Sequence, residues 1–467
     1  MPLPLRTELP YQENSAALFE AVADSPWAAF LDSGRHQPGQ SRYDILAAQP
    51  YLRLVTRGNL TEVHADGVLL SREDPFLLLK RYLDIDPALA CDLPFGGGAI
   101  GYFGYDLARR IERLPSRATA GERIPDMAIG IYDWAVVVDH LERKSWLVGQ
   151  GRDPETDIRW NALVAQFSRA VPEHARLPFR VTSGVESSRT RESYARAFRR
   201  IKQYISDGDC YQVNLAQRFA ASASGDPWLA YQALRVINPA PFSAYLSTPY
   251  AHILSSSPER FLRVDRGAVQ TRPIKGTRPR AGHPRLDAEL AEALRVSEKD
   301  RAENVMIVDL LRNDLSKNCE LGSVKVPRLF EVESYATVHH LVSTVTGQLR
   351  VGRDAIDLLR GCFPGGSITG APKLRAMEII DEVERFRRGV YCGAIGYISF
   401  DGGMDTNIAI RTLTLSHGTV RFWAGGGIIA DSEVESEYQE SFDKARAMMR
   451  LLEQCAATEN SGGLRRN

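Results

Sequence analysis

Apolar and polar residues follow two different periods along the chain, and the period separates predicted strands from predicted helices. In residues 51–70 and 127–149, short β-rich runs alternate with turn residues, which predicts two antiparallel hairpins. The second hairpin is interrupted by the polar turn 142–144. The same pattern predicts further strands within residues 252–264, 268–277, 392–400, 406–415 and 419–428.

A helical period begins after residue 190. Thr190 can cap a helix in which apolar residues recur three or four positions apart, from Tyr194 to Ile205, before SDGD ends it. Strands and helices are mixed without strict βαβ alternation, which predicts an α+β fold. Further helices are predicted over residues 286–294, 298–311 and 437–452.

The composition is that of an ordinary globular protein, and it excludes several classes. The chain has 467 residues, of which 44% are hydrophobic and 25% charged. Lys and Arg (58) balance Asp and Glu (58), so nothing favours nucleic acid or a membrane surface as partner. No apolar run reaches the roughly 18 residues of a membrane helix, and the Pro-broken, charged start predicts no signal peptide. Six scattered Cys without a CxxC pair predict reduced thiols and a cytoplasmic protein.

The sequence divides into two regions and a tail. There is no internal repeat, and the polar, Pro-containing stretch 171–190 is the best linker candidate. We therefore predict an N-terminal region over 1–180, a second region over 190–455, and a flexible tail over 456–467.

Several common motifs are excluded by their context. GGGAIG at 96–101 runs into GYFGYDL rather than a helix, so it is not a dinucleotide fingerprint. FPGGSITGAPK at 363–373 is not a P-loop, because Gly370 is followed by Ala and Pro. HExxH, GxSxG and the GxCxG nucleophile turn of a glutaminase are all missing from the sequence.

Two predicted helices each carry a pair of acids spaced three apart. The spacing places Asp300 with Glu303, and Glu437 with Glu440, on one face of each helix. If the two faces meet, a cation must relieve their repulsion, and carboxylate oxygens suit Mg²⁺. The alternative is a solvated surface on which Glu440 pairs with Lys444. Spacing alone leaves both interpretations open.

Lys275 lies in PIKGT at the end of an apolar strand. Desolvation there would lower its pKa and make it a nucleophile; the alternative is a surface lysine whose stem lies along apolar residues. The glycine-rich runs GGSITGAPK and WAGGGI offer backbone N–H groups to anionic oxygens, or are ordinary turns. His340, Arg411 and Lys444 are candidate partners for charged substrate groups, although each is equally explained as a structural residue.

Taken in order, the motifs from residue 191 to 452 resemble the chorismate-utilising enzyme family. The N-terminal part is similar to that of anthranilate synthase and aminodeoxychorismate synthase large subunits through FLDSG, SRYDILAAQP, PFGGGAIGYFGYDL and NPAPFSAYL. The resemblance implies an anthranilate synthase component I-like α/β/β/α sandwich with two packed, mainly antiparallel sheets. The motifs are SSSPERFLRV, TRPIKGTRPR, AENVMIVDLLRNDLSK, HHLVSTVTG, FPGGSITGAPKLRAME, CGAIGYISF, DTNIAIRT, GGGIIADSE and SEYQES.

Three positions indicate which reaction the resemblance implies. Relatives that add water carry a lysine where this chain has Gln212, which has no useful basicity, so ammonia is the expected nucleophile. Anthranilate synthases typically read PIAGT, whereas aminodeoxychorismate synthases read PIKGT, as here at Lys275, and Asn304 agrees. The resemblance thus implies a large subunit that makes 4-amino-4-deoxychorismate for 4-aminobenzoate and folate. The alternatives are an anthranilate synthase component I and a tryptophan-binding relative without catalysis.

The resemblance also implies roles for individual residues. Glu259 would protonate the leaving hydroxyl and Lys275 would form a covalent intermediate. Mg²⁺ would be bound by Glu303 and Glu440, with Asp300 and Glu437 nearby. A separate glutamine amidotransferase subunit would supply ammonia. Chorismate would be bound by Gln212, Thr277, His340, Thr369, Tyr391, Arg411, Gly426, Gly427 and Lys444.

Relatives also keep a tryptophan pocket in the N-terminal region. Four residues match its positions, but FLDSG carries Asp32 where relatives vary, so whether tryptophan binds is left open. Val434 replaces a helix-starting Pro of relatives, and Asp443 stands where Asn is common; neither removes a proposed ligand. The four pocket residues are Ser33, Tyr43, Pro241 and Phe242.

Overall fold

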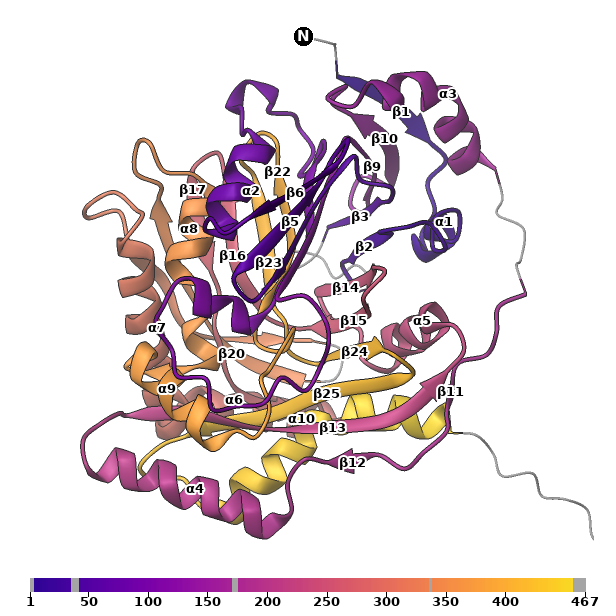
Figure 1. The fold of residues 1–467 in the computed structure, drawn as a ribbon. Coiled ribbons are helices and arrows are strands. Elements are labelled where there is room, and N and C mark those ends of the chain that lie inside the picture. The colour runs from indigo at the N-terminus through magenta and orange to yellow at the C-terminus, as the bar shows by residue number, and fades with distance from the viewer. Residues whose placement is uncertain (1–3, 35–41, 170–174, 336–337, 457–467) are drawn as a thin grey trace, which may run out of the picture.

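Two large antiparallel sheets form the centre of the molecule, which we describe from a computed structural model (Figure 1). The structure describes residues 4–34, 42–169, 175–335 and 338–456, so nearly all of the predicted tail lies outside the described residues. Over these residues, every pairing between named strands is antiparallel. This confirms the predicted α+β class.

The first sheet joins strands from both regions of the sequence. Its described part has thirteen strands, and the two regions meet where β2 pairs with β14, with Ala244 opposite Leu31. The order is β1 (Leu5–Leu9), β10 (Lys144–Gly149), β9 (Trp134–Asp139), β3 (Tyr43–Ala47), β2 (Ala29–Asp32), β14 (Phe242–Ser247), β15 (His252–Ser257), β24 (Thr412–Ser416), β25 (Thr419–Ile428), β13 (Gln212–Ser224) and β11 (Arg180–Val181), with β12 (Glu186–Ser187) and β21 (Gly370–Ala371) also paired to β13.

The second sheet is joined in the same way. Its described part has twelve strands, and the regions meet where β7 pairs with β22, with Gly101 opposite Gly396. A Cβ at Gly101 would lie 2.1 Å from the carbonyl oxygen of Ala128, on the strand that pairs with the other edge of β7, so the approach of that strand requires glycine. The order is β18 (Ile274–Pro279), β20 (Val338–Gln348), β17 (Ala268–Thr271), β16 (Arg260–Asp265), β23 (Met404–Ile408), β22 (Ala394–Ser399), β7 (Gly98–Phe103), β8 (Met127–Tyr132), β4 (Leu52–Arg57), β5 (Leu60–His64) and β6 (Val68–Ser71), with β19 (Lys325–Ser334) paired to β20.

Helices cover the outer faces of the two sheets and complete the layers. One core cluster joins α1 (Ala16–Phe19), α3 (Pro154–Ser168), α5 (Pro227–Ile237) and α10 (Val434–Gln454) to the first sheet. Another joins α2 (Pro75–Leu83), α7 (Glu298–Ser316) and α8 (Ala355–Cys362) to the second. A third cluster, with Ile45, Val137, Ile100 and Ile395, fills the space between the sheets. The remaining helices are α4 (Arg191–Ser206), α6 (Pro284–Val296), α9 (Lys373–Val383) and the 3₁₀ turns η1 (Pro87–Leu89), η2 (Tyr105–Arg110) and η3 (Gly366–Ile368).

Most predicted elements are present, and the differences lie where the chain passes from one sheet to the other. The predicted strands 252–264 and 406–415 each divide into two strands of different sheets, β15 and β16 in the first case and β23 and β24 in the second. Thr190 caps α4 by accepting from the backbone N–H of Ser193, as predicted. The run 127–149 is not one hairpin, because β8 belongs to the second sheet whereas β9 and β10 pair in the first. The chain crosses from one sheet to the other at Asp133. The alternation of apolar and polar residues along a strand does not reveal which sheet that strand joins.

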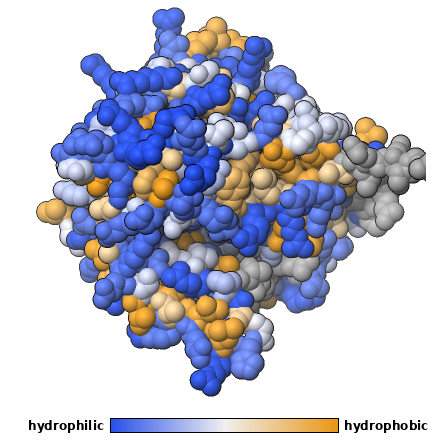
Figure 2. Space-filling view, turned by 90° about the horizontal axis from the view of Figure 1, so that it is seen from below, coloured by the Kyte–Doolittle hydropathy of each residue, from blue (hydrophilic) through white to orange (hydrophobic). Residues whose placement is uncertain are grey.

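The surface gives no sign of a membrane-crossing helix. Among the described residues, no helix is both long and apolar enough to span a bilayer. The face seen in Figure 2 is largely hydrophilic, with hydrophobic residues confined to smaller areas.

Candidate active site

Lys275 occupies an irregular position on β18. The pairing with β20 places it opposite Leu341, and the register shifts before Thr277. Gly276, at the shift, has φ 76°, and a Cβ there would lie 2.7 Å from a methyl carbon of Leu294, so glycine is required. The Lys275 ammonium nitrogen lies 3.4 Å from the carbonyl oxygen of Ser367 and donates to it.

The buried carboxyl group of Glu259 lies on the other side of Ser367. The Ser367 hydroxyl donates to Oε1 of Glu259 at 2.8 Å, so Ser367 connects the two predicted catalytic residues. Burial raises the pKa of Glu259, against the Ser367 hydrogen bond and the charge of Lys275. Burial lowers the pKa of Lys275, against the charge of Glu303. The sequence analysis missed Ser367, because a serine in a glycine-rich turn has no distinctive pattern.

Two acids of α10 converge on β25. A Cβ at Gly426 would lie 3.1 Å from both Oε2 of Glu437 and Oε1 of Glu440, so glycine leaves room between strand and carboxylates. Glu437 accepts from the Ser432 hydroxyl through Oε1, while its buried Oε2 has no hydrogen-bond partner within the part of the chain that the structure describes. Burial raises the pKa of Glu437. An unpartnered buried oxygen is costly unless a ligand satisfies it.

The remaining predicted metal residues lie on α7. Burial raises the pKa of Glu303, and the charges of Asp300 and Glu440 act in the same direction, which places Glu303 within electrostatic reach of the acids of α10. Asp300 instead pairs with Arg278 at 3.1 Å. Among the described residues, no group of three or more His, Cys, Asp or Glu side chains is already close enough together to hold a metal ion.

Lys444 pairs with Glu440 at 2.6 Å, so the ion pair considered in the sequence analysis is present. Burial disfavours ionisation of Glu440, but the charge of Lys444 and its hydrogen bond outweigh burial and lower the pKa of Glu440.

Arg411 is a cation without an acidic partner. Among the described residues, no carboxylate forms an ion pair with it, and its guanidinium donates from Nη1 to Oδ1 of Asn238 at 3.5 Å. Burial lowers its pKa. Nearby His340 is neutral, because burial and the charge of Arg411 lower its pKa to about 3. Its Nδ1 lies 2.9 Å from the Thr277 hydroxyl. An anion could therefore pair with Arg411 without displacing a protein carboxylate.

Gln212 and Tyr391 are buried, predicted substrate-binding residues with different surroundings. Both polar side-chain atoms of Gln212 lack partners, and a Cβ at Gly427 would lie 2.5 Å from its Nε2. Tyr391 stacks on Trp423 with ring centres 6.0 Å apart.

Thr369 is fully buried, and its hydroxyl is already used in hydrogen bonds within its own turn. Its hydroxyl donates within the turn, to the carbonyl oxygens of Gly365 and Gly366.

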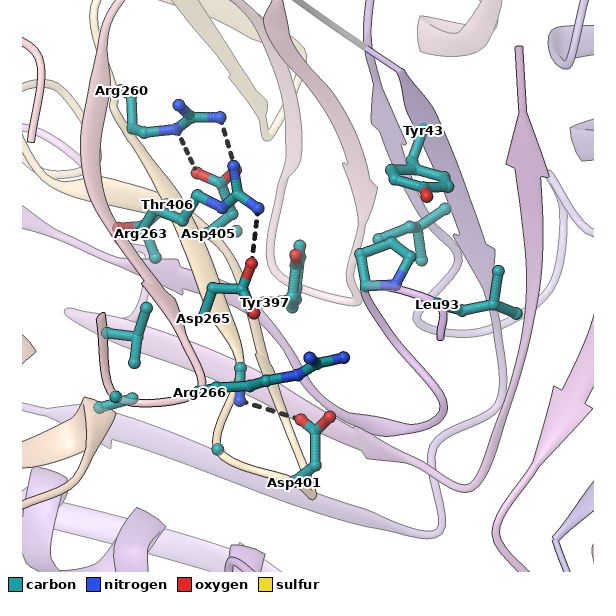
Figure 3. Close-up of a pocket in the computed structure, with 18 of the residues that line it drawn as sticks. Tyr43, Leu93, Arg260, Arg263, Asp265, Arg266, Tyr397, Asp401, Asp405 and Thr406 are labelled. Atoms are coloured by element: carbon teal, nitrogen blue, oxygen red, sulfur yellow. Dashed lines mark hydrogen bonds and ion pairs between the residues drawn. The ribbon is translucent and has the colours of Figure 1, made fainter. Parts of the chain in front are cut away.

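The predicted tryptophan pocket lies elsewhere, in a cavity of about 1160 Å³. Ser33, Tyr43, Pro241 and Phe242 all line it, whereas the predicted catalytic and metal residues do not. Figure 3 shows Tyr43 and Leu93 across the cavity from Arg260 and Arg263. Asp32, also in the lining, accepts from Tyr231 and Arg235.

Comparison with known proteins identifies the family. A family model described as chorismate binding enzyme matches residues 29–450. This chain belongs to that family. A relative from Klebsiella aerogenes, "Aminodeoxychorismate synthase component 1", is 50% identical over 455 residues, covering 96% of this chain and 99% of the relative. The protein of the same name from Escherichia coli K12 is 48% identical over 459 residues, covering 95% and 97%.

Solved structures confirm the fold class. The crystal structure of anthranilate synthase component I from Streptococcus pneumoniae TIGR4 matches with a TM-score of 0.79 and 33% identity. The match covers 89% of this chain and 94% of the other. The predicted layered sandwich is therefore confirmed as the fold of this chorismate-binding enzyme.

Proposed function

We propose that this chorismate-binding enzyme is the large subunit of an aminodeoxychorismate synthase, which converts chorismate and ammonia to 4-amino-4-deoxychorismate. The names of the two relatives at 48–50% identity support the proposal. The observation that carries it within the structure is the position of Lys275, whose amine shares Ser367 with Glu259.

Arg411 and His340 would receive the anionic substrate. A desolvated guanidinium without a carboxylate partner among the described residues binds a substrate carboxylate strongly. The imidazole of His340 is neutral and therefore adds no charge beside that carboxylate. Further proposed substrate contacts are Tyr391, Lys444 and the backbone N–H groups of Gly426 and Gly427. Thr277 and Thr369 are proposed to shape the site through hydrogen bonds, Thr277 with His340 and Thr369 within its own turn.

Magnesium is the proposed cofactor of the acids of α7 and α10, whose carboxylates would draw together around the ion. The unpartnered Oε2 of Glu437 and the open space at Gly426 are what a hard cation with oxygen ligands requires. We assign Glu303, Glu437 and Glu440 as ligands; Asp300 would first have to leave Arg278. When bound, Mg²⁺ would polarise the ring carboxylate as a Lewis acid.

The reaction is assigned to two side chains of this chain. Glu259, whose pKa burial raises, is the proposed acid that gives its proton to the departing 4-hydroxyl. The neutral amine of Lys275 bonds to ring carbon 2, both ring double bonds shift by one position, and the protonated hydroxyl leaves as water, so the lysine nitrogen becomes a secondary ammonium. Ammonia next bonds to carbon 4, both double bonds return, the bond from carbon 2 to the lysine nitrogen breaks, and lysine leaves as a neutral amine while the new nitrogen carries the positive charge. One difficult displacement thereby becomes two easier ones.

Ammonia rather than water is the proposed nucleophile, because uncharged Gln212 cannot act as a general base. The relatives' designation as component 1 supports a second component. We assign this role to a glutamine amidotransferase that delivers ammonia.

Product identification tests the proposal. The chain is incubated with chorismate and ammonium chloride, with and without Mg²⁺, and products are separated and identified by mass spectrometry. We expect 4-amino-4-deoxychorismate only with Mg²⁺. Fluorescent anthranilate, formed without any lyase, would instead assign an anthranilate synthase.

Tryptophan is the proposed ligand of the cavity at Tyr43 and Phe242. Calorimetry with tryptophan should then give saturable binding that Phe242→Asp abolishes while chorismate turnover persists. Tryptophan binding without any turnover at high ammonium would indicate the non-catalytic alternative.

A further inference from the structure

A buried arginine lies directly behind the proposed active site. Arg388 follows α9, and only 2% of its surface is exposed. Its Nε and Nη2 donate to both oxygens of Glu384, at 2.9 and 2.8 Å, in a two-pronged ion pair. Its guanidinium carbon lies 4.8 Å from the ring centre of Tyr105 and 5.8 Å from that of Tyr391.

The same guanidinium binds two backbone carbonyls at the rear of the site. Nη1 donates to the carbonyl oxygen of Ile368 at 2.9 Å, and Nη2 to that of Asn214 at 3.0 Å. Glu384 completes the arrangement by accepting from the backbone N–H of Ala216 at 2.9 Å. The ion pair thus ties the η3 turn to β13.

The carbonyl of Ile368 belongs to the residue directly after Ser367. Asn214 also contacts this turn, since its side-chain amide donates to the Ser367 carbonyl oxygen and its backbone N–H to that of Thr369. Arg388 therefore holds, through Ile368 and Asn214, the segment on which Ser367 faces both Lys275 and Glu259.

We propose that Arg388, neutralised by Glu384, is a positioning residue that fixes Ser367 between Lys275 and Glu259. The effect of this positioning on catalysis rests on the proposed function. A buried ion pair often adds little net stability compared with apolar side chains of similar size. An arginine here, however, satisfies two buried carbonyls with one planar, rigid group, which Lys or Met cannot do.

The test uses the double variant Arg388→Met with Glu384→Gln, which removes both charges and so avoids leaving one buried and unpaired. The control is Arg176→Met. Arg176 is partly buried, with 8% of its side chain exposed, and it pairs with Glu20, Asp24 and Asp226, none of which contacts a residue of the proposed site.

Two readouts separate positioning from stability. Hydrogen–deuterium exchange of a peptide spanning residues 365–371 should be faster in the double variant and unchanged in the control. With chorismate and ammonium, kcat should fall about 10- to 100-fold while the KM for chorismate changes less than about 3-fold, because a small misplacement of reacting groups costs this much. The control should keep the kcat of the unchanged protein.

Unchanged exchange at 365–371, or a kcat equal to that of the control, would overturn the proposal. If the double variant does not fold, Arg388→Lys replaces it, since it keeps the charge but cannot hold the carboxylate and both carbonyls together. If the unchanged protein makes no 4-amino-4-deoxychorismate, the proposed function fails, and the exchange measurement alone then decides whether Arg388 fixes the turn.

Discussion

The hydroxyl of Ser367 donates to Oε1 of Glu259 at 2.8 Å and thereby favours the ionised form of a carboxyl group whose pKa burial raises. The proposed general acid is thus held between two opposing effects. Ser367 also presents its carbonyl oxygen to Lys275, and this second contact comes from the backbone rather than the side chain.

Ser367→Ala should therefore move one limb of the pH–rate profile. Without the hydroxyl, the ionised form of Glu259 loses a stabilising hydrogen bond and its pKa rises further. Because the protonated form is active, activity is lost as pH rises through this pKa, so the alkaline limb of kcat/KM should move to higher pH. Glu259→Gln is the control: it should lack this limb and lose about 10²- to 10⁴-fold in kcat. An unmoved limb in Ser367→Ala would argue against Glu259 as the acid.

Lys275→Ala should abolish most turnover while leaving chorismate binding largely intact. A loss of about 100-fold or more in kcat, roughly 2.7 kcal/mol of barrier, is expected from removing the nucleophile. In the unchanged protein, the neutral amine is active and burial lowers its pKa, so activity should fall as pH drops through that lowered value. Steady-state kinetics and calorimetry with chorismate check both statements, and unchanged turnover would refute the covalent route.

Gly426→Ala should weaken magnesium binding. The added methyl would lie 3.1 Å from oxygens of Glu437 and Glu440, so both carboxylates must shift. We expect the Mg²⁺ concentration for half-maximal activity to rise about 10-fold, because disturbing the groups that orient metal ligands typically weakens metal binding by at least this much. Calorimetry with MgCl₂ checks it directly. Gly184→Ala is the matched control, since its Cβ meets nothing within 4 Å and should leave Mg²⁺ affinity unaltered.

Arg411→Met should stabilise the protein and damage it as an enzyme. A buried guanidinium without an acidic partner costs free energy in the unliganded state, so the variant should have a higher melting temperature. Its KM for chorismate should rise about 10- to 100-fold, consistent with the loss of a charged hydrogen bond of roughly 1.5–3 kcal/mol. A lower melting temperature together with an unchanged KM would show that Arg411 is structural.

His340→Gln should leave both limbs of the pH–rate profile where they are. With a pKa of about 3, the imidazole is neutral from pH 5 to 9 and does not titrate in the working range. A neutral amide can replace its hydrogen bond with Thr277, so a change in kcat without a shift of either limb is expected. A limb that disappears with His340 would assign it a proton-transfer role instead.

The sequence predicted element types better than their assignment to sheets. β25 was predicted over the same residues that form it, and α10 extends only a few residues beyond its predicted ends, because their periods and boundaries are local. Which sheet a strand joins depends on distant partners, and so the crossing between β8 and β9 was missed.

The candidate site shows the same limit. The resemblance named Lys275 and Glu259, which the structure connects through Ser367. Ser367 and Arg388 could not be found from the pattern, since their importance lies in contacts between distant parts of the chain. The Ser367 hydroxyl donates to Glu259, and Arg388 donates to backbone carbonyls, which any residue offers. The roles of the predicted site residues stay predictions until the variants are measured.

The two seams, β2 with β14 and β7 with β22, run through both sheets. A polypeptide starting near residue 190 would therefore leave the edges of β14 and β22 unpaired, would also lose β11 and β12 from β13, and should be insoluble alone. If the chain is divided near residue 190 and the two halves are produced separately, refolding them together should restore both sheets. The strands of one half would then pair again with those of the other along these edges.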